Sequence, residues 1–177
     1  IDGNIVSKDD AIATCYNLED AVIKHSIDTS KGMSVIRFSS KDGRVNSKNL
    51  TTIETLFNSY NKDFIVQEAI KQSKEMASLN PTSLNTIRIM TYWSENGIVP
   101  LFSVVRMGRA GSVVDNASAG GIYCGVNMDG SLKKYAYTLV PFTKHTHTDS
   151  GVELQNFRIP QFDRLICKAV ELHRYLP

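Results

Sequence analysis

A lysine at the end of an apolar run is the first residue of this sequence that could do chemistry. Lys24 ends the run Ala21–Lys24, and a polar turn, Thr29–Ser34, follows it and contains Ser30 and Gly32. A strand-end ammonium can neutralise a phosphate, while the backbone N–H groups of a flexible turn donate to other phosphate oxygens. An ordinary hairpin with a solvated lysine contains the same residue types, so both interpretations stay open.

The segment Phe64–Ile70 is the second candidate, because an apolar run ends there in two polar residues, Gln67 and Glu68, shortly before Ile70. If this segment is a hinge, its backbone could hydrogen-bond the edge of an adenine, and its carboxylate could hold ribose hydroxyls. An ordinary strand end explains the pattern equally well.

Two arginines in apolar strands are the third candidate. Arg88 lies between Ile87 and Ile89, so strand alternation places its side chain on the opposite face from theirs. A guanidinium in such a strand needs an anionic partner, either a protein carboxylate or a ligand phosphate. Arg106 ends the neighbouring strand, so the two guanidinium groups are expected to converge. Convergence favours a phosphate site.

The loop that follows Arg106 is the fourth candidate. Small and polar residues dominate it as far as Gly121, between two apolar strands. Such a loop lets the backbone approach a ligand closely, and Asp115 and Asn116 place an acid and an amide within it. A loop without a function would have a similar composition.

Common nucleotide and hydrolase motifs are missing from the sequence. It contains no Gly-x-x-x-x-Gly-Lys-Ser/Thr loop, no Gly-x-Gly-x-x-Gly turn, no His-Glu-x-x-His and no Gly-x-Ser-x-Gly. A bound nucleotide would therefore need a phosphate-binding segment of another kind.

Composition narrows the class of protein. With 177 residues, 42% of them hydrophobic and 21% charged, the chain can bury a core. Its net charge of +2 argues against nucleic acid as a partner, and no apolar run approaches the roughly 18 residues of a membrane span. The separated cysteines Cys15, Cys124 and Cys167 form no Cys-x-x-Cys pair, which is typical of reduced thiols in a cytoplasmic protein.

The elements that must position the candidates begin with two capped helices. Ser7 predicts an N-cap for a helix that runs toward Leu18, and Thr51-Thr52-Ile53-Glu54 predicts a capping box for a second helix. Lys41–Arg44 predicts a turn. Strands are predicted at residues 21–24, 35–38 and 64–68.

The later part of the chain is rich in hairpin signals. Asn96-Gly97 predicts a hairpin between Thr86–Trp93 and Ile98–Arg106. Asp129-Gly130 predicts a second hairpin between Gly121–Met128 and Leu132–Thr138.

The run Ile98–Val105 is apolar at nearly every position, which predicts a strand covered on both faces. A final helix is expected after Pro160. The fold class is therefore α+β, with two β-containing lobes and an antiparallel meander that helices cover.

Together these motifs resemble the ATP-grasp superfamily, and specifically the sugar-transfer-associated ATP-grasp proteins found among polysaccharide genes. The resemblance spans nearly the whole chain and implies an ATP-grasp core with a small lobe at residues 1–70 and a large lobe at 71–177. Because the chain lacks an initiator Met and stops directly after a helical pattern, we expect a fragment whose large lobe is truncated. The resemblance rests on Lys24 with its turn, Gln67-Glu68, Asn85-Thr86-Ile87-Arg88-Ile89, Arg106, Asp115-Asn116, Gly120-Gly121, His147–Gly151 and Ile159–Asp163.

The family implies ATP-dependent ligation with ATP and Mg²⁺ as cofactors. A carboxylate is phosphorylated to an acyl phosphate, and an amine or similar nucleophile displaces the phosphate. The acceptor would be a small carboxylate or sugar-linked molecule. By the same resemblance, Lys24, Ser30 and Gly32 would contact the phosphates of ATP, and Gln67, Glu68 and Ile70 would hold its adenosine. Arg88 and Arg106 would stabilise charge on the transferred phosphoryl group. Asp115 and Asn116 would lie near the γ-phosphate or the acceptor.

The sequence departs from the family pattern in two places. Met33 and Ser34 stand where the phosphate turn would carry Lys and Gly, and no Glu-x-Asn pair is present to hold Mg²⁺. We therefore expect nucleotide binding by this chain without turnover.

Two other functions stay open. The first is a non-catalytic nucleotide- or sugar-binding module that partners a glycosyltransferase. The second is a metal-dependent hydrolase built on His145-Thr146-His147-Thr148-Asp149, because imidazole and carboxylate groups suit zinc.

Overall fold

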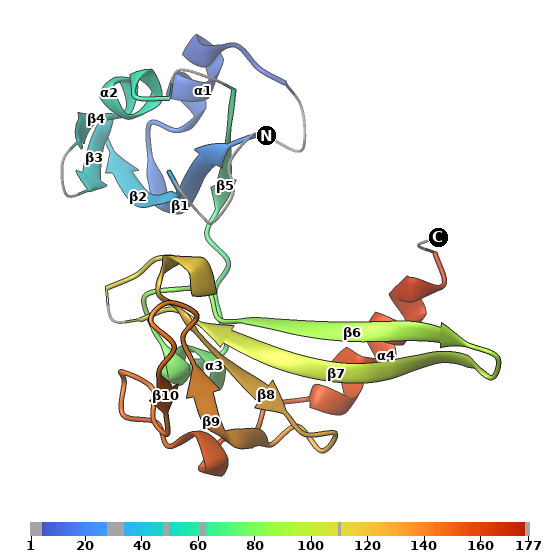
Figure 1. Ribbon diagram of the computed structural model, residues 1–177. Helices are drawn as coiled ribbons and strands as arrows, with labels where there is room; N and C mark the ends of the chain where they lie inside the picture. Colours follow the sequence, from blue (N-terminus) through green and yellow to red (C-terminus); the bar gives the residue numbers. More distant parts are fainter. Residues whose placement is uncertain (1–4, 28–33, 48–49, 61–62, 110, 176–177) are drawn as a thin grey trace. The chain divides into compact units, whose positions relative to one another are not determined.

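The computed structural model divides the chain into two compact units, unit 1 at Ile1–Lys71 and unit 2 at Gln72–Pro177 (Figure 1). Their assignment as the small and large lobes of an ATP-grasp enzyme stays a prediction. Within the part that the structure describes, no helix combines the length and the apolar character needed to cross a membrane. The described residues are 5–27, 34–47, 50–60, 63–109 and 111–175.

In its described residues, unit 1 is a five-stranded antiparallel sheet with two short helices (Figure 1). The strand order is β4-β3-β2-β1-β5, so β1 lies between β2 and β5. The elements are α1 (Lys8–Thr14), β1 (Leu18–His25), β2 (Ile36–Lys41), β3 (Arg44–Ser47), β4 (Leu50–Thr52), α2 (Ile53–Asn58) and β5 (Phe64–Glu68).

Both helices of unit 1 begin at a hydroxyl cap, but two boundaries differ from those that the sequence predicts. The Ser7 side chain accepts from the Asp10 N–H as predicted, yet α1 ends at Thr14 because Leu18 already begins β1. Helix α2 is capped by Thr52, whose hydroxyl accepts from the Thr55 N–H. The capping box predicted from Thr51 is wrong, because β4 continues through Thr52 and delays the helix by one residue.

The core of unit 1 lies on one face of its sheet. Ile23 of β1 and Phe38 of β2 point to this face, where Leu56 and Phe57 of α2 cover them, and all four are almost fully buried. Strand alternation then places Lys24 on the opposite face of β1.

Unit 2 is a second five-stranded antiparallel sheet, in the order β10-β9-β8-β7-β6 (Figure 1). Strand β6 lies at its edge. The elements are α3 (Lys74–Leu79), β6 (Thr86–Ser94), β7 (Gly97–Met107), η1 (Ala117–Ala119), β8 (Ile122–Val126), β9 (Leu132–Tyr137), β10 (Lys144–His145), η2 (Leu154–Asn156) and α4 (Phe162–His173).

The α+β prediction and both predicted hairpins are confirmed. Gly97, with φ of 109°, joins β6 to β7, and Gly130, with φ of 86°, lies between β8 and β9. Both glycines occupy the positive-φ region that these turns require.

The core of unit 2 lies on one face of this sheet. Val105, Ile122 and Cys124 are nearly inaccessible, and η2 and the start of α4 cover them with Leu154 and Phe162. The opposite face, which we call the open face, carries the residues that alternate with these: Arg106, Tyr123 and their cross-strand neighbours.

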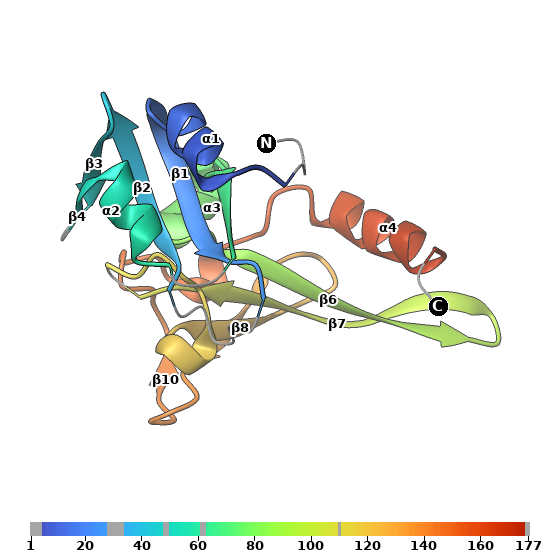
Figure 2. The same ribbon diagram turned by 90° about the horizontal axis from the view of Figure 1, so that it is seen from above.

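The far half of the β6–β7 hairpin, residues 90–102, forms an arm on which one predicted feature is wrong. Leu101 and Phe102 are about half exposed, at 53% and 52%, so Ile98–Val105 is not covered on both faces as expected. Helix α4 packs along one side of the arm, where His173 meets Thr91 and Trp93 (Figure 2). The apolar character of the run Ile98–Val105 therefore does not mean that both faces of the strand are covered.

Candidate functional site

The register of β6 and β7 places the two predicted arginines on one face. Thr86 pairs with Arg106 and Arg88 pairs with Val104, so Arg88 and Arg106 are diagonal neighbours on the open face. Diagonal neighbours in an antiparallel pair have Cα atoms about 7–8 Å apart, close enough for both side chains to contact one ligand. The structure thus brings the two arginines to one region as expected, and it does so through a shift of the hairpin register between Met90 and Thr91.

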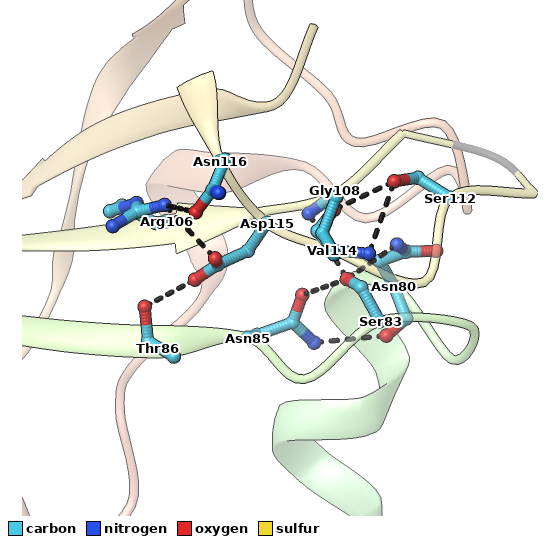
Figure 3. Close-up of polar contacts among 10 residues, drawn as sticks. All are labelled: Asn80, Ser83, Asn85, Thr86, Arg106, Gly108, Ser112, Val114, Asp115 and Asn116. Carbon is cyan, nitrogen blue, oxygen red and sulfur yellow. Dashed lines mark hydrogen bonds and ion pairs between the residues drawn. The ribbon is translucent and has the colours of Figure 1, made fainter. Parts of the chain in front are cut away.

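Arg106 is held in a polar cluster that also contains Thr86, Asp115 and Asn116 (Figure 3). Its Nη2 donates to Asp115 Oδ1 at 3.0 Å and to Asn116 Oδ1, while the Thr86 hydroxyl donates to Asp115 Oδ2. The Arg106 and Asp115 side chains are only 13% and 11% exposed. Asp115 therefore positions Arg106, and the carboxylate already has two donors.

Thr86 belongs to the motif Asn85-Thr86-Ile87-Arg88-Ile89, but it is the residue of this cluster for which the sequence predicts no role. It lies two positions before Arg88, so strand alternation alone places both on one face. The pairing with Arg106 additionally depends on a shift of the hairpin register by one residue between Met90 and Thr91, since counting back from the Asn96-Gly97 turn alone would pair Thr86 with Val105.

A second group of hydrogen bonds fixes the place where β6 begins and β7 ends (Figure 3). Asn85 Nδ2 donates to the carbonyl oxygens of Met76 and Asn80 at 2.8 and 2.9 Å. Ser83 Oγ accepts from the Gly108 N–H at 3.1 Å. A Cβ at Gly108 would come within 2.6 Å of Ser83 Oγ, so only glycine allows this approach. The ends of β6 and β7 are thereby locked together beside Arg106.

The loop after β7 is tied to the same region. Thr82 donates to the Ser112 carbonyl at 2.8 Å, and Arg109 forms an ion pair with Asp149 at 2.7 Å. The Asn116 carbonyl accepts from the Gly121 N–H at 3.0 Å. These contacts hold Asp115 and Asn116 where they meet Arg106.

Arg88 differs from Arg106 in its surroundings. It is exposed, and none of the residues described by the structure forms a hydrogen bond or ion pair with its guanidinium. An arginine fork without a protein partner beside a fixed one can receive an anionic group with two or more oxygens. A phosphate or a carboxylate has that form.

The candidates of unit 1 are placed as follows. Lys24 pairs with Ile65 and Gln67 pairs with Val22, so Lys24 and Gln67 share the face of the sheet opposite the core. Glu68 pairs with Ala21, so its backbone position belongs to the core face of the sheet, although its side chain is exposed. Ile70 is an exposed residue beyond β5. The remaining phosphate-turn candidates, Ser30 and Gly32, lie outside the described residues.

The His-x-His-x-Asp stretch does not form a metal centre. His145 Nε2 lies 2.8 Å from Thr143 Oγ1, His147 Nδ1 lies 3.0 Å from Thr146 Oγ1, and Asp149 pairs with Arg109. Within the described part of the chain, no group of three or more His, Cys, Asp or Glu side chains could hold a metal ion. The structure therefore gives no support to the hydrolase alternative.

The fold and the arginine pair fit a nucleotide-binding protein of the ATP-grasp class, and the family comparison agrees. The chain belongs to the sugar-transfer-associated ATP-grasp family, whose model matches residues 2–177. This membership confirms the resemblance seen in the sequence and supports an ATP-binding, ligase-like domain. Searches of curated proteins and of solved structures find no match.

Proposed function

We propose that this chain is the ATP-binding part of an ATP-dependent ligase that acts in polysaccharide or cell-surface glycan biosynthesis. In the proposed reaction, an acceptor carboxylate oxygen attacks the γ-phosphorus of ATP. A new O–P bond forms, the bond from the γ-phosphorus to the β–γ bridging oxygen breaks, and ADP leaves with that electron pair. An amine or similar nucleophile then attacks the acyl carbon, and inorganic phosphate leaves.

The observation that carries this proposal is the arginine pair in a protein of this family. Arg106 is fixed in its cluster before any ligand arrives, while Arg88 has no partner among the described side chains. Preorganised cations aimed at a transferring phosphoryl group stabilise the charge that develops there. We assign Arg106 to orientation and Arg88 to direct contact with the phosphates, with Asn116 beside them.

The remaining roles follow from the family. Lys24 would contact phosphates, and Gln67 and Glu68 would hold adenine and ribose. The described residues around the arginines do not fit Mg²⁺, because the carboxylate there, Asp115, already accepts from Arg106 and Thr86. No step of the proposed reaction is therefore assigned to the metal.

A cytoplasmic location and a glycosyltransferase partner stay predictions. The cysteines Cys15, Cys124 and Cys167 are all free thiols, which is the state favoured in a reducing compartment.

Calorimetric titration with Mg-ATP tests the arginine pair. Replacing Arg88 with Met keeps the length of the side chain but removes the charged donors, at an expected cost of about 1.5–3 kcal/mol, or roughly ten- to a hundredfold in Kd. Arg164→Met is the matched control, since Arg164 is an exposed residue of α4 that donates to Gln161. Equal affinities of R88M and the parent chain would remove the assigned site.

Turnover is measured separately, by trapping the acyl phosphate with hydroxylamine in the presence of a carboxylate. Because the sequence has no Glu-x-Asn pair to hold Mg²⁺, ATP binding that depends on Arg88 without hydroxamate is the expected result for this chain, and robust hydroxamate formation would contradict that expectation.

A further inference from the structure

A row of side chains continues from Arg106 across the open face of unit 2. Arg106 pairs with Tyr123, Tyr123 pairs with Tyr137, and Tyr137 pairs with Lys144 of β10. Directly paired residues lie side by side on one face, so the row runs across four strands, β7 to β10. We call the part beyond Arg106 the tyrosine–lysine face; it comprises Tyr123, Lys133, Tyr135, Tyr137, Phe142 and Lys144.

The aromatic rings of this face form a continuous surface. The Tyr123 and Tyr137 ring centroids are 6.1 Å apart. Phe142 stacks on Tyr137 with centroids 5.3 Å apart and an interplanar angle of 15°, and it is 68% exposed. Both tyrosines are only partly buried, so ring surface remains accessible beside Arg106.

Lysines flank the rings. Lys144 Nζ lies 3.5 Å from the centroid of the Tyr135 ring, and Lys134 Nζ lies 5.5 Å from it. The Lys133 stem crosses Gly125, where a Cβ would come within 2.9 Å of Lys133 Cδ. No carboxylate in the described ranges forms an ion pair with any of these three lysines. The face is therefore aromatic and cationic, which is the complement of an anionic ring.

The size of the face decides what kind of molecule fits it. Neighbouring strands are about 4.8 Å apart, so the Cα atoms of Arg106 and Lys144, three strands apart, are separated by about 14 Å. A molecule of two or three sugar rings covers that span. One of its carboxylates could lie near Arg88 and Arg106 while its body rests on Tyr123 and Tyr137.

We infer that the tyrosine–lysine face binds the acceptor of the proposed ligation, and that this acceptor is an acidic carbohydrate. The C–H bonds on the flat side of a pyranose carry partial positive charge and suit the negative face of an aromatic ring. The lysines supply the positive charge that attracts a sugar carboxylate. This inference rests on the proposed function for the role of acceptor, while binding of the acidic sugar itself does not require ATP.

The test is a titration with a uronic-acid trisaccharide and with the matching neutral trisaccharide, followed by amide NMR spectra. The acidic sugar is expected to bind at least tenfold more tightly and to shift the amide signals of β8 to β10. Lys144→Gln is expected to weaken it about five- to tenfold, and Phe142→Ala, at an exposed ring, by a similar factor. Lys168→Gln, on exposed α4, is the control and is expected to leave the affinity unchanged.

A titration of the same variants with Mg-ATP separates this inference from the proposed function. Lys144→Gln is expected to keep the parent affinity for ATP. Equal binding of the neutral and acidic sugars, or absence of sugar binding in a chain that binds ATP through Arg88, would overturn the inference and leave the function standing. Sugar binding that depends on Lys144 in a chain that fails to bind ATP would support the face and refute the nucleotide role. Equal loss of ATP affinity in K144Q and R88M would overturn the inference, because the face would then belong to the nucleotide site.

Discussion

Replacement of Asp115 with Leu should destabilise unit 2 more than the loss of one hydrogen bond would. The change leaves the Arg106 guanidinium in a position only 13% exposed, with the Asn116 amide oxygen as its acceptor, and leaves the Thr86 hydroxyl without Asp115. Breaking one side of a buried ion pair costs about 3–5 kcal/mol. Because about a tenth of each side chain remains exposed, we expect the low end, about 3 kcal/mol.

Replacing both Asp115 and Arg106 shows how much of the lost stability comes from leaving the Arg106 charge unpaired. With Asp115 already Leu, adding Arg106→Leu removes the unpaired charge, so the double variant should be no less stable than Asp115→Leu alone. Asp115→Asn should cost about 1–1.5 kcal/mol, because its amide oxygen still accepts one of the two donors.

Trp93, the one tryptophan of the chain, lies in β6, so its fluorescence during urea unfolding reports on unit 2. For a unit of this size the denaturant slope is about 1–1.5 kcal/mol/M, so Asp115→Leu should lower the urea midpoint by about 2–3 M. Glu171→Gln, in an exposed pair with Lys168, is the control and should leave the midpoint unchanged. A strictly additive double variant, or a midpoint shift no larger than that of the control, would refute the reasoning.

Three further predictions concern other parts of the chain. Arg37 donates to Asp20 and lowers the pKa of that carboxyl, so the folded state binds the Asp20 proton less tightly than the unfolded state does. The ion pair therefore stabilises the fold fully above the usual pKa of 3.8, and this stabilisation is lost as the pH falls through the lower folded-state pKa. The melting temperatures of Asp20→Asn and the parent should therefore differ at pH 6, and the difference should shrink as the pH falls below 3.8. Burial raises the pKa of Cys124 to about 11, so a disulfide reagent at pH 8 should label exposed Cys167 first and Cys124 only after unfolding. Asn85→Asp places a carboxylate against carbonyl oxygens that now accept from Nδ2, and should lower unit 2 stability by about 2–3 kcal/mol in the same urea assay.

The features that the sequence predicts well are those set by neighbouring residues. Both hairpins of unit 2 form where Asn96-Gly97 and Asp129-Gly130 stand, because the positive φ of Gly97 and Gly130 is a local requirement of the turn. The shared face of Arg88 and Arg106 is not local in this sense, because it depends on the shift of the hairpin register between Met90 and Thr91, which the sequence pattern does not show.

The features that the sequence does not predict depend on distant residues. The sequence does not show that the Asp115 carboxylate accepts hydrogen bonds from Arg106 and from Thr86, which lies 29 positions earlier. The run Ile98–Val105 is uniformly apolar, yet α4 covers the arm on one side and leaves Phe102 half exposed. Composition measures how apolar a strand is, while exposure depends on where α4 packs.

The arm has a consequence for handling the protein at high concentration. Met90, Tyr92 and Phe102 are each at least half exposed, and among the described strands only β7 pairs with β6. An apolar strand edge of this kind is a template for pairing with the same strand of another molecule. In the arm, β7 is less suited to such pairing than β6, because its Pro100 lacks a backbone N–H. Self-association should therefore begin at β6, and a lysine at Phe102 should raise the solubility limit while leaving the buried ends of both strands intact.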